Sequence, residues 1–177
     1  MGGLEYLELA ETAAYAGCTR RVRAYWHHLQ TAYPEFRRYR IKSIAARIGV
    51  RETFRVHCEY MLNENDLLQG ISKQGHRDIV ALSDHMMDSH GAAGRKSGEL
   101  HEPYGIPYRC LIPKGFSNML VAGRIAGFSS IAASSCRLSR TMMQLGQAAG
   151  NAAILALKES GNFRNVSMPE TYKATEV

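Results

Sequence analysis

The sequence has no long hydrophobic run, and its N-terminus has no basic stretch leading into an apolar segment. The first absence excludes a membrane-spanning helix, which needs about 18 consecutive apolar residues. The second excludes a secretory signal peptide. Together they predict a soluble, cytoplasmic protein.

Cysteine is also scarce, and none of the four forms a C-x-x-C pair. This excludes a zinc ribbon, a thioredoxin-like site and a local ligand set for an iron–sulfur cluster. The histidines at 85, 90 and 101 have neither the spacing nor the neighbours of a metal site, so no metal is expected. The sequence predicts four reduced thiols that act as small hydrophobic residues: Cys18, Cys58, Cys110 and Cys136.

Acidic residues are nearly missing from one segment. The 177 residues carry 22 Lys and Arg against 16 Asp and Glu, a net charge of +6, and residues 20–42 hold seven of the basic residues with Glu35 as their only acid. Aromatic residues lie between them, a combination found in nucleic-acid-binding proteins. No nucleic-acid motif accompanies the segment. We therefore expect a solvated basic face, or one that contacts an acidic partner, rather than a nucleic-acid site.

Hydrophobic periodicity and helix-ending residues predict the secondary structure of the first half of the chain. Residues 4–32 have helical character, and Pro34 ends that run because the residue before a proline avoids helical geometry. Residues 52–60 alternate between apolar and polar, which predicts a half-buried strand. Asn63 is placed to cap a short helix that stops by Gly70.

The middle of the chain is less regular. Residues 78–82 form a possible strand, and residues 89–102, rich in glycine and charge, predict a surface loop. Residues 104–112 resume extended character, with Pro107 indicating an edge or irregular strand. No repeat or low-complexity linker marks a domain boundary.

Residues 117–161 are the most informative segment. The apolar run at 119–122 predicts a strand of a parallel α/β sheet covered on both faces, and it ends at Gly123 and Arg124, at the edge where such sheets bind ligands. After a loop of small residues, a long helix is expected from about Ser135 to Lys158, capped by Ser134 or Ser135. Gly161 is placed to end it.

Two features of this helix need an explanation. Gly146, Ala149, Gly150 and Ala153 form a ridge of small residues, although each glycine in a helix costs about 1 kcal/mol relative to alanine. The ridge could serve close helix–sheet packing or the approach of a ligand. Arg137 and Arg140, expected in the first turn, oppose the helix dipole unless an anion lies there or both point to solvent.

The segments YGIPYRCLIPKG, SNMLVAGR and SSCRLSRTMMQLGQAAGNAA resemble, in this order, the C-terminal part of FAD-dependent oxidoreductases of the FAD-oxidored type. These are related to the flavoprotein subunit of heterodisulfide reductase. The segments IGVRETFRVHCEYMLNENDLLQG and DIVALSDHMMDSHG resemble the preceding part of the family. The resemblance runs, with gaps, from about residue 4 to residue 161.

The resemblance implies an α/β (mixed α+β) fold and FAD as the cofactor of an oxidoreductase that acts on an unidentified small substrate. Residues 1–112 would form a helical and β substrate-side or cap region. Residues 113–161 would form the final strand, loop and long helix of a Rossmann-like FAD-binding domain, followed by a tail at 162–177. Cofactor contacts are implied for Gly123, Arg124, Ser135, Arg137, Gly146, Gln147 and Ala148.

Substrate and catalytic residues are predicted less directly. Arg51, Tyr104 and Arg109 are candidates for substrate contact, with His57 as a further possibility. The catalytic residue is unknown, with Arg109, Arg137 and His90 as candidates. Arg109 stands inside the family-like motif.

The sequence departs from the family in two places. Family members carry a histidine roughly where Ser130 stands, so this chain uses another proton-transfer group or lacks the activity. It also has no G-x-G-x-x-G motif for the pyrophosphate of FAD. We therefore expect the C-terminal portion of a larger flavoprotein, which would partner a nucleotide-binding half or a second copy. The alternatives are a truncated, non-catalytic remnant or scaffold and, with less support, a basic nucleic-acid-binding module.

Overall fold

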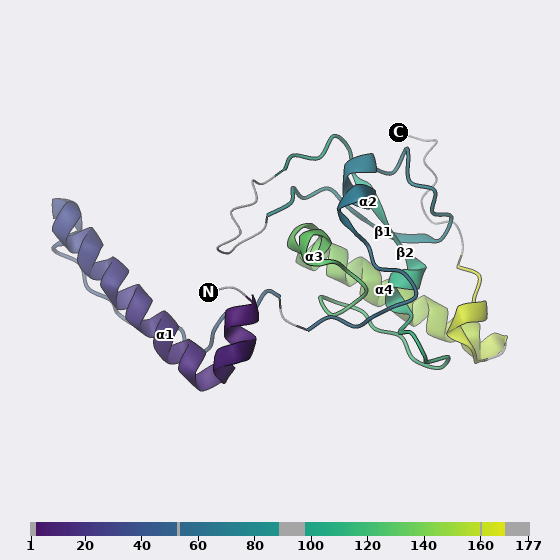
Figure 1. Cartoon of the computed structure of the whole chain (residues 1–177), viewed down its shortest axis with the longest axis horizontal. Coiled ribbons are helices and arrows are strands. Elements are labelled where there is room, and N and C mark those ends of the chain that lie inside the picture. Colours follow the sequence, from purple (N-terminus) through teal and green to yellow (C-terminus); the bar gives the residue numbers. More distant parts are fainter. Residues whose placement is uncertain (1–2, 53, 89–97, 160, 169–177) are drawn as a thin grey trace. The chain divides into compact units, whose positions relative to one another are not determined.

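The computed structural model describes residues 3–52, 54–88, 98–159 and 161–168 (Figure 1). The chain divides into two compact units, Met1–Thr53 and Phe54–Val177. The boundary expected at 112/113 from the family therefore falls inside the second unit. The nine residues from 89 to 97, which include most of the expected surface loop, lie outside the described residues.

The first unit consists of the long helix α1 (Gly3–Ala32), the short 3-10 helix η1 (Pro34–Phe36) and an irregular segment after it. The helix expected over 4–32 is confirmed, with a break at Ala10, whose φ is 58°. Trp26 packs edge-on against Phe36 at 5.9 Å between ring centroids, and the Gln30 side chain donates to the Tyr39 carbonyl at 3.0 Å. Pro34 and these contacts turn the chain back along the end of α1.

The second unit contains a two-stranded antiparallel sheet of β1 (Ile79–Ser83) and β2 (Tyr104–Pro107). The strand expected at 78–82 is confirmed. The extended segment expected at 104–112 is a strand only over its first four residues, after which the chain forms the 3-10 helix η2 (Tyr108–Leu111). The register slips between Ile79 and Ala81, and Ile79 lies opposite Pro107, so the irregularity expected of that proline is present.

The parallel sheet expected from residues 119–122 is wrong. The described residues form only the antiparallel β1–β2 pair, and the apolar run belongs to no strand. Val121 donates its amide to the Leu111 carbonyl at 2.9 Å, while Met119 is 45% exposed. The run is apolar because it packs on the core as a loop. Apolar residues in a loop can be buried in this way without neighbouring strands.

The strand expected at 52–60 is also wrong, because none of the described residues in this range belongs to a strand. Its backbone amides donate to carbonyls of separate segments: Val56 to Ile125 at 2.7 Å and Glu59 to Ile112 at 2.8 Å. Cys58 forms an isolated bridge with Pro113, and Phe54, which the pattern buries, is 73% exposed. An alternating pattern indicates which side chains face the core, but a strand also needs backbone hydrogen bonds to one continuous neighbouring strand.

Helix α2 (Glu64–Gln69) begins and ends where the sequence predicts. The Asn63 side chain accepts from the Asn65 amide at 3.0 Å, and Asp66 accepts from the Asn63 amide at 2.9 Å, which completes a capping box. Gly70, with a φ of 66°, follows the last turn. A left-handed backbone of this kind favours glycine.

The long helix expected from Ser135 to Lys158 is two helices, α3 (Ser130–Cys136) and α4 (Ser139–Lys158). Ser129 caps α3 by accepting from the Ala132 amide at 3.1 Å, so the predicted caps Ser134 and Ser135 are wrong. The chain leaves helical geometry at Leu138, whose ψ is 148°. After α4, Gly161 takes a φ of 68° and donates to the Ala156 carbonyl at 2.7 Å, as expected of the residue that ends the helix.

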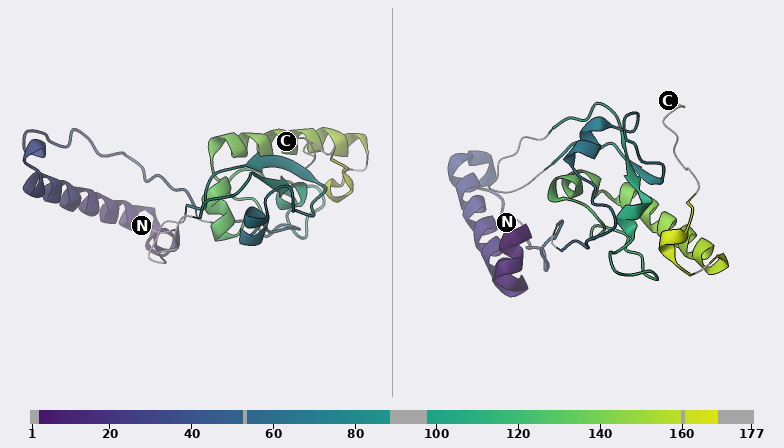
Figure 2. Two further views of the ribbon diagram at one scale, coloured as in Figure 1. Left: turned by 90° about the horizontal axis from the view of Figure 1, so that it is seen from above. Right: turned by 45° about the vertical axis from the view of Figure 1, so that its right-hand side comes forward.

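Helix α4 lies along the sheet of the second unit (Figure 2), and the last short helix η3 (Phe163–Asn165) follows it. The Gln144 side chain accepts from the Leu82 amide at 2.9 Å and donates to the Leu82 carbonyl at 3.3 Å, so it fastens α4 to β1. The core beneath includes Tyr104, Ile106, Leu111, Phe128 and Leu145, all at most 1% exposed.

Candidate functional site

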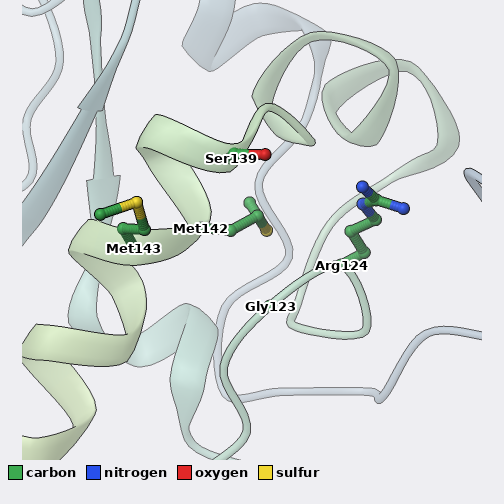
Figure 3. A pocket seen from close by; sticks show the side chains of 5 residues that line it. All are labelled: Gly123, Arg124, Ser139, Met142 and Met143. Atoms are coloured by element: carbon green, nitrogen blue, oxygen red, sulfur yellow. The ribbon is translucent and has the colours of Figure 1, made fainter.

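A pocket of about 400 Å³ lies between the start of α4 and the turn at Gly123 and Arg124 (Figure 3). Gly123 has a φ of 96°, a backbone conformation that residues with a Cβ atom rarely adopt. Ser139, Met142 and Met143 line the pocket from the first two turns of α4. The turn and the helix thus bring a guanidinium, a hydroxyl and two thioethers around one opening.

The N-terminus of α4 adds a positive electrostatic field to this pocket. Its cap is Leu138, which has no polar side chain, and no side-chain cap bond forms there. The first-turn N–H groups of a helix carry about half a positive charge and favour anions. Arg140, in this turn as predicted, forms an ion pair with Asp84. The pair explains this cation without an anionic ligand, because the carboxylate neutralises it.

The face of α4 that continues from the pocket is open. Gly146, Gln147 and Gly150 are exposed. Apart from the neighbouring residues and the nearby backbone of α4, no atom lies within 4 Å of a Cβ atom added at either glycine. Close helix–sheet packing therefore does not explain the two glycines within the described residues. Met143, one turn before Gly146 and Gln147, connects them to the pocket.

Arg137 lies elsewhere than its sequence position predicts. It is the C-cap of α3 rather than a first-turn residue of a long helix, and there a cation is favourable to the dipole. It is only 8% exposed, and its Nη2 donates to the Asp88 carbonyl at 3.0 Å and to the Asp88 carboxylate at 3.2 Å. The electrostatic conflict that suggested an anion at Arg137 does not exist.

Three other predicted site residues are buried in the core of the second unit. The Tyr104 hydroxyl lies 2.7 Å from Ser135 Oγ, and Ser135 also contacts the His85 carbonyl. Burial raises the pKa of Tyr104 well above its usual value, so its hydroxyl stays protonated. Ala148 is 5% exposed and faces the same core. In this conformation these side chains hold α3, α4 and β2 together.

The predicted substrate residues are not gathered at the pocket. Arg109 is held by Asp78, which accepts from Arg109 Nε at 3.1 Å and from its backbone amide at 3.2 Å. His57 is exposed at the surface of the second unit. Arg51 belongs to the first unit, and His90 lies outside the described residues.

Sequence reasoning missed Ser139, Met142 and Met143. Their position in the sequence could have indicated them, because they precede Gly146 and Gln147 by one or two helical turns. It was hidden because the expected helix started at Ser135, which places its first turn one turn too early. With α4 starting at Ser139, these residues stand at the end that faces Gly123 and Arg124.

The basic residues of the first unit are all exposed. With seven basic residues and one acid, Glu35, residues 20–42 have a net charge of +6, which equals the net charge of the whole chain. Tyr25, Tyr33 and Tyr39 are 65%, 47% and 52% exposed among them. We call the following side chains the basic set: Arg20, Arg21, Arg23, Arg37, Arg38, Arg40 and Lys42.

Comparison with protein families identifies the class. The model of the family described as FAD dependent oxidoreductase matches residues 4–174, and the chain belongs to this family. No curated protein and no solved structure gives a significant match. Within the described part of the chain, no helix combines the length and hydrophobicity that a membrane span requires.

Proposed function

We propose that the chain binds the isoalloxazine end of FAD in the pocket between Gly123–Arg124 and the start of α4, as part of an FAD-dependent oxidoreductase acting on a small substrate. The observation that carries this proposal is the convergence at one pocket of the Gly123 turn, the Arg124 guanidinium and a helix N-terminus without a side-chain cap. The family match to residues 4–174 supports it.

The residues present fit a flavin. The volume of about 400 Å³ is within the range of about 300–1,000 Å³ typical of small-molecule sites. Met142 and Met143 offer polarisable contacts to a flat aromatic ring, whereas Ser139 and Arg124 offer hydrogen-bond donors to a polar ring edge. In Figure 3, Met142 extends from α4 toward the Gly123–Arg124 turn.

Bound FAD would supply the acceptor for a hydride or for electrons. The residues of this chain would supply orientation and charge. Donors and dipoles aimed at one edge of the ring favour negative charge there, and Arg124 with the first turn of α4 provides both. Gly146 and Gln147, on the open face beyond Met143, would border the remainder of the cofactor.

The adenosine end of FAD needs other groups, because the sequence has no G-x-G-x-x-G motif. We propose that a nucleotide-binding half supplies them and that this chain is the C-terminal portion of the complete flavoprotein. The alternative is a non-catalytic remnant, which the missing motif also supports. Ser130 stands roughly where the resemblance implies a histidine, so an active protein would need another proton-transfer group.

Titration with FAD, followed by flavin fluorescence and by the melting temperature, tests the proposal. Arg124→Ala should weaken binding by roughly 10- to 100-fold, because a hydrogen bond from a charged donor contributes about 1.5–3 kcal/mol. Arg77→Ala, at an exposed arginine of the same unit that does not line the pocket, is the matched control. Equal affinities for the two variants would contradict the proposed site, and a wild-type chain indifferent to FAD would support the remnant.

A second candidate function rests on the basic set. Because its seven cations are all exposed and their segment has the same net charge as the whole chain, the basic set could bind an acidic partner. An acidic polypeptide such as polyglutamate should bind with an affinity that falls steeply as salt is raised. Lys42→Glu with Arg40→Glu should abolish that binding, whereas binding that ignores salt would exclude the role. Tighter binding of a single-stranded oligonucleotide would instead favour the nucleic-acid alternative.

A further inference from the structure

A network of polar side chains, separate from the proposed flavin pocket, surrounds His76 in the second unit. His76 Nε2 lies 3.1 Å from Asp66 Oδ1, and His76 Nδ1 lies 3.1 Å from Arg109 Nη2. The Tyr60 ring packs against the imidazole at 4.7 Å between centroids. The His76 side chain is only 14% exposed, so these neighbours form most of its surroundings.

The donors and acceptors of the network determine where the imidazole proton lies. A guanidinium has donors only, so Arg109 Nη2 must donate and His76 Nδ1 must accept with its lone pair. His76 is then neutral with its proton on Nε2, and that proton is donated to Asp66. One tautomer of a neutral histidine satisfies both neighbours, and the other tautomer satisfies neither.

Asp66 is positioned to keep this arrangement. It is 6% exposed and also accepts from the Tyr60 hydroxyl at 2.8 Å and from the Asn63 amide at 2.9 Å. Burial and the bond to Asp66 raise the pKa of Tyr60 to about 12, so its hydroxyl remains a donor. A carboxylate with three donors around it is fixed in place and directs the histidine.

Arg109 is held on its other side as well. Asp78 accepts from Arg109 Nε at 3.1 Å and from Nη2 at 3.3 Å, and the guanidinium carbon lies 5.3 Å from the centre of the Tyr60 ring. The groups that face His76 and Arg109 are thus Asp66 from α2, Tyr60 from the segment before α2, and Asp78, which directly precedes β1. His76 is the member of this set whose ring nitrogens can each either donate or accept a hydrogen bond.

We infer that His76 is a positioning residue that holds the Arg109 guanidinium over the Tyr60 ring while it is neutral and releases it when protonated. Protonation turns Nδ1 from an acceptor into a donor, which then faces another donor and a like charge at 3.1 Å. The bond to Asp66 is kept, because Nε2 donates in both states. The change is therefore confined to the Arg109 side, where the guanidinium keeps Asp78 but loses His76.

The inference does not depend on the flavin proposal, because its test needs neither FAD nor substrate. The contact between Arg109 and His76 is expected while the imidazole is neutral, and its loss is expected on acidification.

Nitrogen-15 NMR of the complete 177-residue chain tests the inference. The His76 ring signals are assigned as those missing from His76→Gln. At neutral pH, Nδ1 should have the chemical shift of a bare nitrogen and Nε2 that of a protonated one. On acidification both should become protonated, and the Arg109 Nε–H resonance should shift with the same midpoint.

Two variants separate positioning from simple support. His76→Gln keeps an N–H donor for Asp66 but cannot titrate, so the Arg109 resonance should lose that pH transition. Arg109→Met should leave the His76 signals in place while removing the Arg109 resonance, which verifies its assignment. The inference is overturned if the opposite tautomer is found at neutral pH, if Arg109 does not follow His76, or if the transition persists in His76→Gln.

Discussion

Replacing Gly146 or Gly150 by alanine should stabilise the protein, and only the first change should weaken FAD binding. Both glycines are exposed residues inside α4, and a Cβ atom at either would meet no atom within 4 Å beyond its own helical surroundings. The fold therefore gains the helix propensity of alanine without a clash. Gly146 is one turn from Met142, which lines the pocket, whereas Gly150 is two turns away.

The expected gain follows from the loss of backbone entropy that glycine suffers in a helix. In a helix interior, glycine is about 0.5–1 kcal/mol less favourable than alanine. For a chain of this size, 1 kcal/mol raises the melting temperature by about 2–4 °C. Each variant should therefore melt about 1–4 °C higher than the wild type.

The matched control is Gly127→Ala, the same chemical change at a crowded position. A Cβ there would lie 2.7 Å from the Cys58 Cβ and against the Tyr60 carbonyl. Gly127 also donates to the Cys110 carbonyl at 2.8 Å and accepts from the Leu62 amide at 2.9 Å. Overpacking costs about 1–3 kcal/mol and each of the two strained hydrogen bonds about 1 kcal/mol, so a loss of roughly 3–5 kcal/mol is expected.

Thermal unfolding followed by circular dichroism, with and without FAD, measures both effects. The reasoning would be refuted if Gly146→Ala or Gly150→Ala lowered the melting temperature of the FAD-free protein, since this would mean that the face is covered. Equal FAD affinity for Gly146→Ala and the wild type would place the cofactor elsewhere. Such a result would leave the predicted stabilisation intact.

Four further predictions concern the thiols, the cap of α2 and the buried Arg137. In the native protein Cys18 should react with a thiol reagent at pH 8 well before Cys58, because Cys58 is fully buried and burial raises its pKa to about 11. Since the pKa of Cys58 is higher in the folded state, its contribution to stability is present below about pH 9 and is lost as the pH rises toward 11, so alkaline unfolding should be delayed in Cys58→Ala. Asn63→Ala should lower the free energy of unfolding by about 1 kcal/mol through loss of the α2 cap, measured by urea denaturation. Arg137→Ala should cost about 2–4 kcal/mol in the same assay, because Asp88 loses a buried partner, and a change below 0.5 kcal/mol would contradict the structural role given to this arginine.

The features that sequence reasoning predicted correctly depend on short stretches of chain. The end of α1 before Pro34 follows from a steric restriction between adjacent residues. Helix α2 follows from Asn63 and Gly70, whose effects on the backbone reach only a few residues. The family follows from ordered motifs such as LVAGR and LGQAAG, and the match to residues 4–174 confirms it.

The candidate pocket could be predicted only in part. Gly123 and Arg124 do line a pocket with the start of a helix, but Ser135 and Ala148 face the core. The difference arises at Leu138, where the chain leaves helical geometry and changes which residues stand at the start of α4. No proline or glycine marks that break, so hydrophobic periodicity ran straight through it.

What the sequence by itself determined is therefore local structure and family membership. Only the tertiary structure decided the partners of the charged side chains: Arg137 binds Asp88 and Arg140 binds Asp84, 49 and 56 residues away in the chain. It also decided that the sheet is an antiparallel pair. Contacts at such separations depend on how the whole chain packs, because bringing distant segments together costs loop entropy that only the complete core can offset.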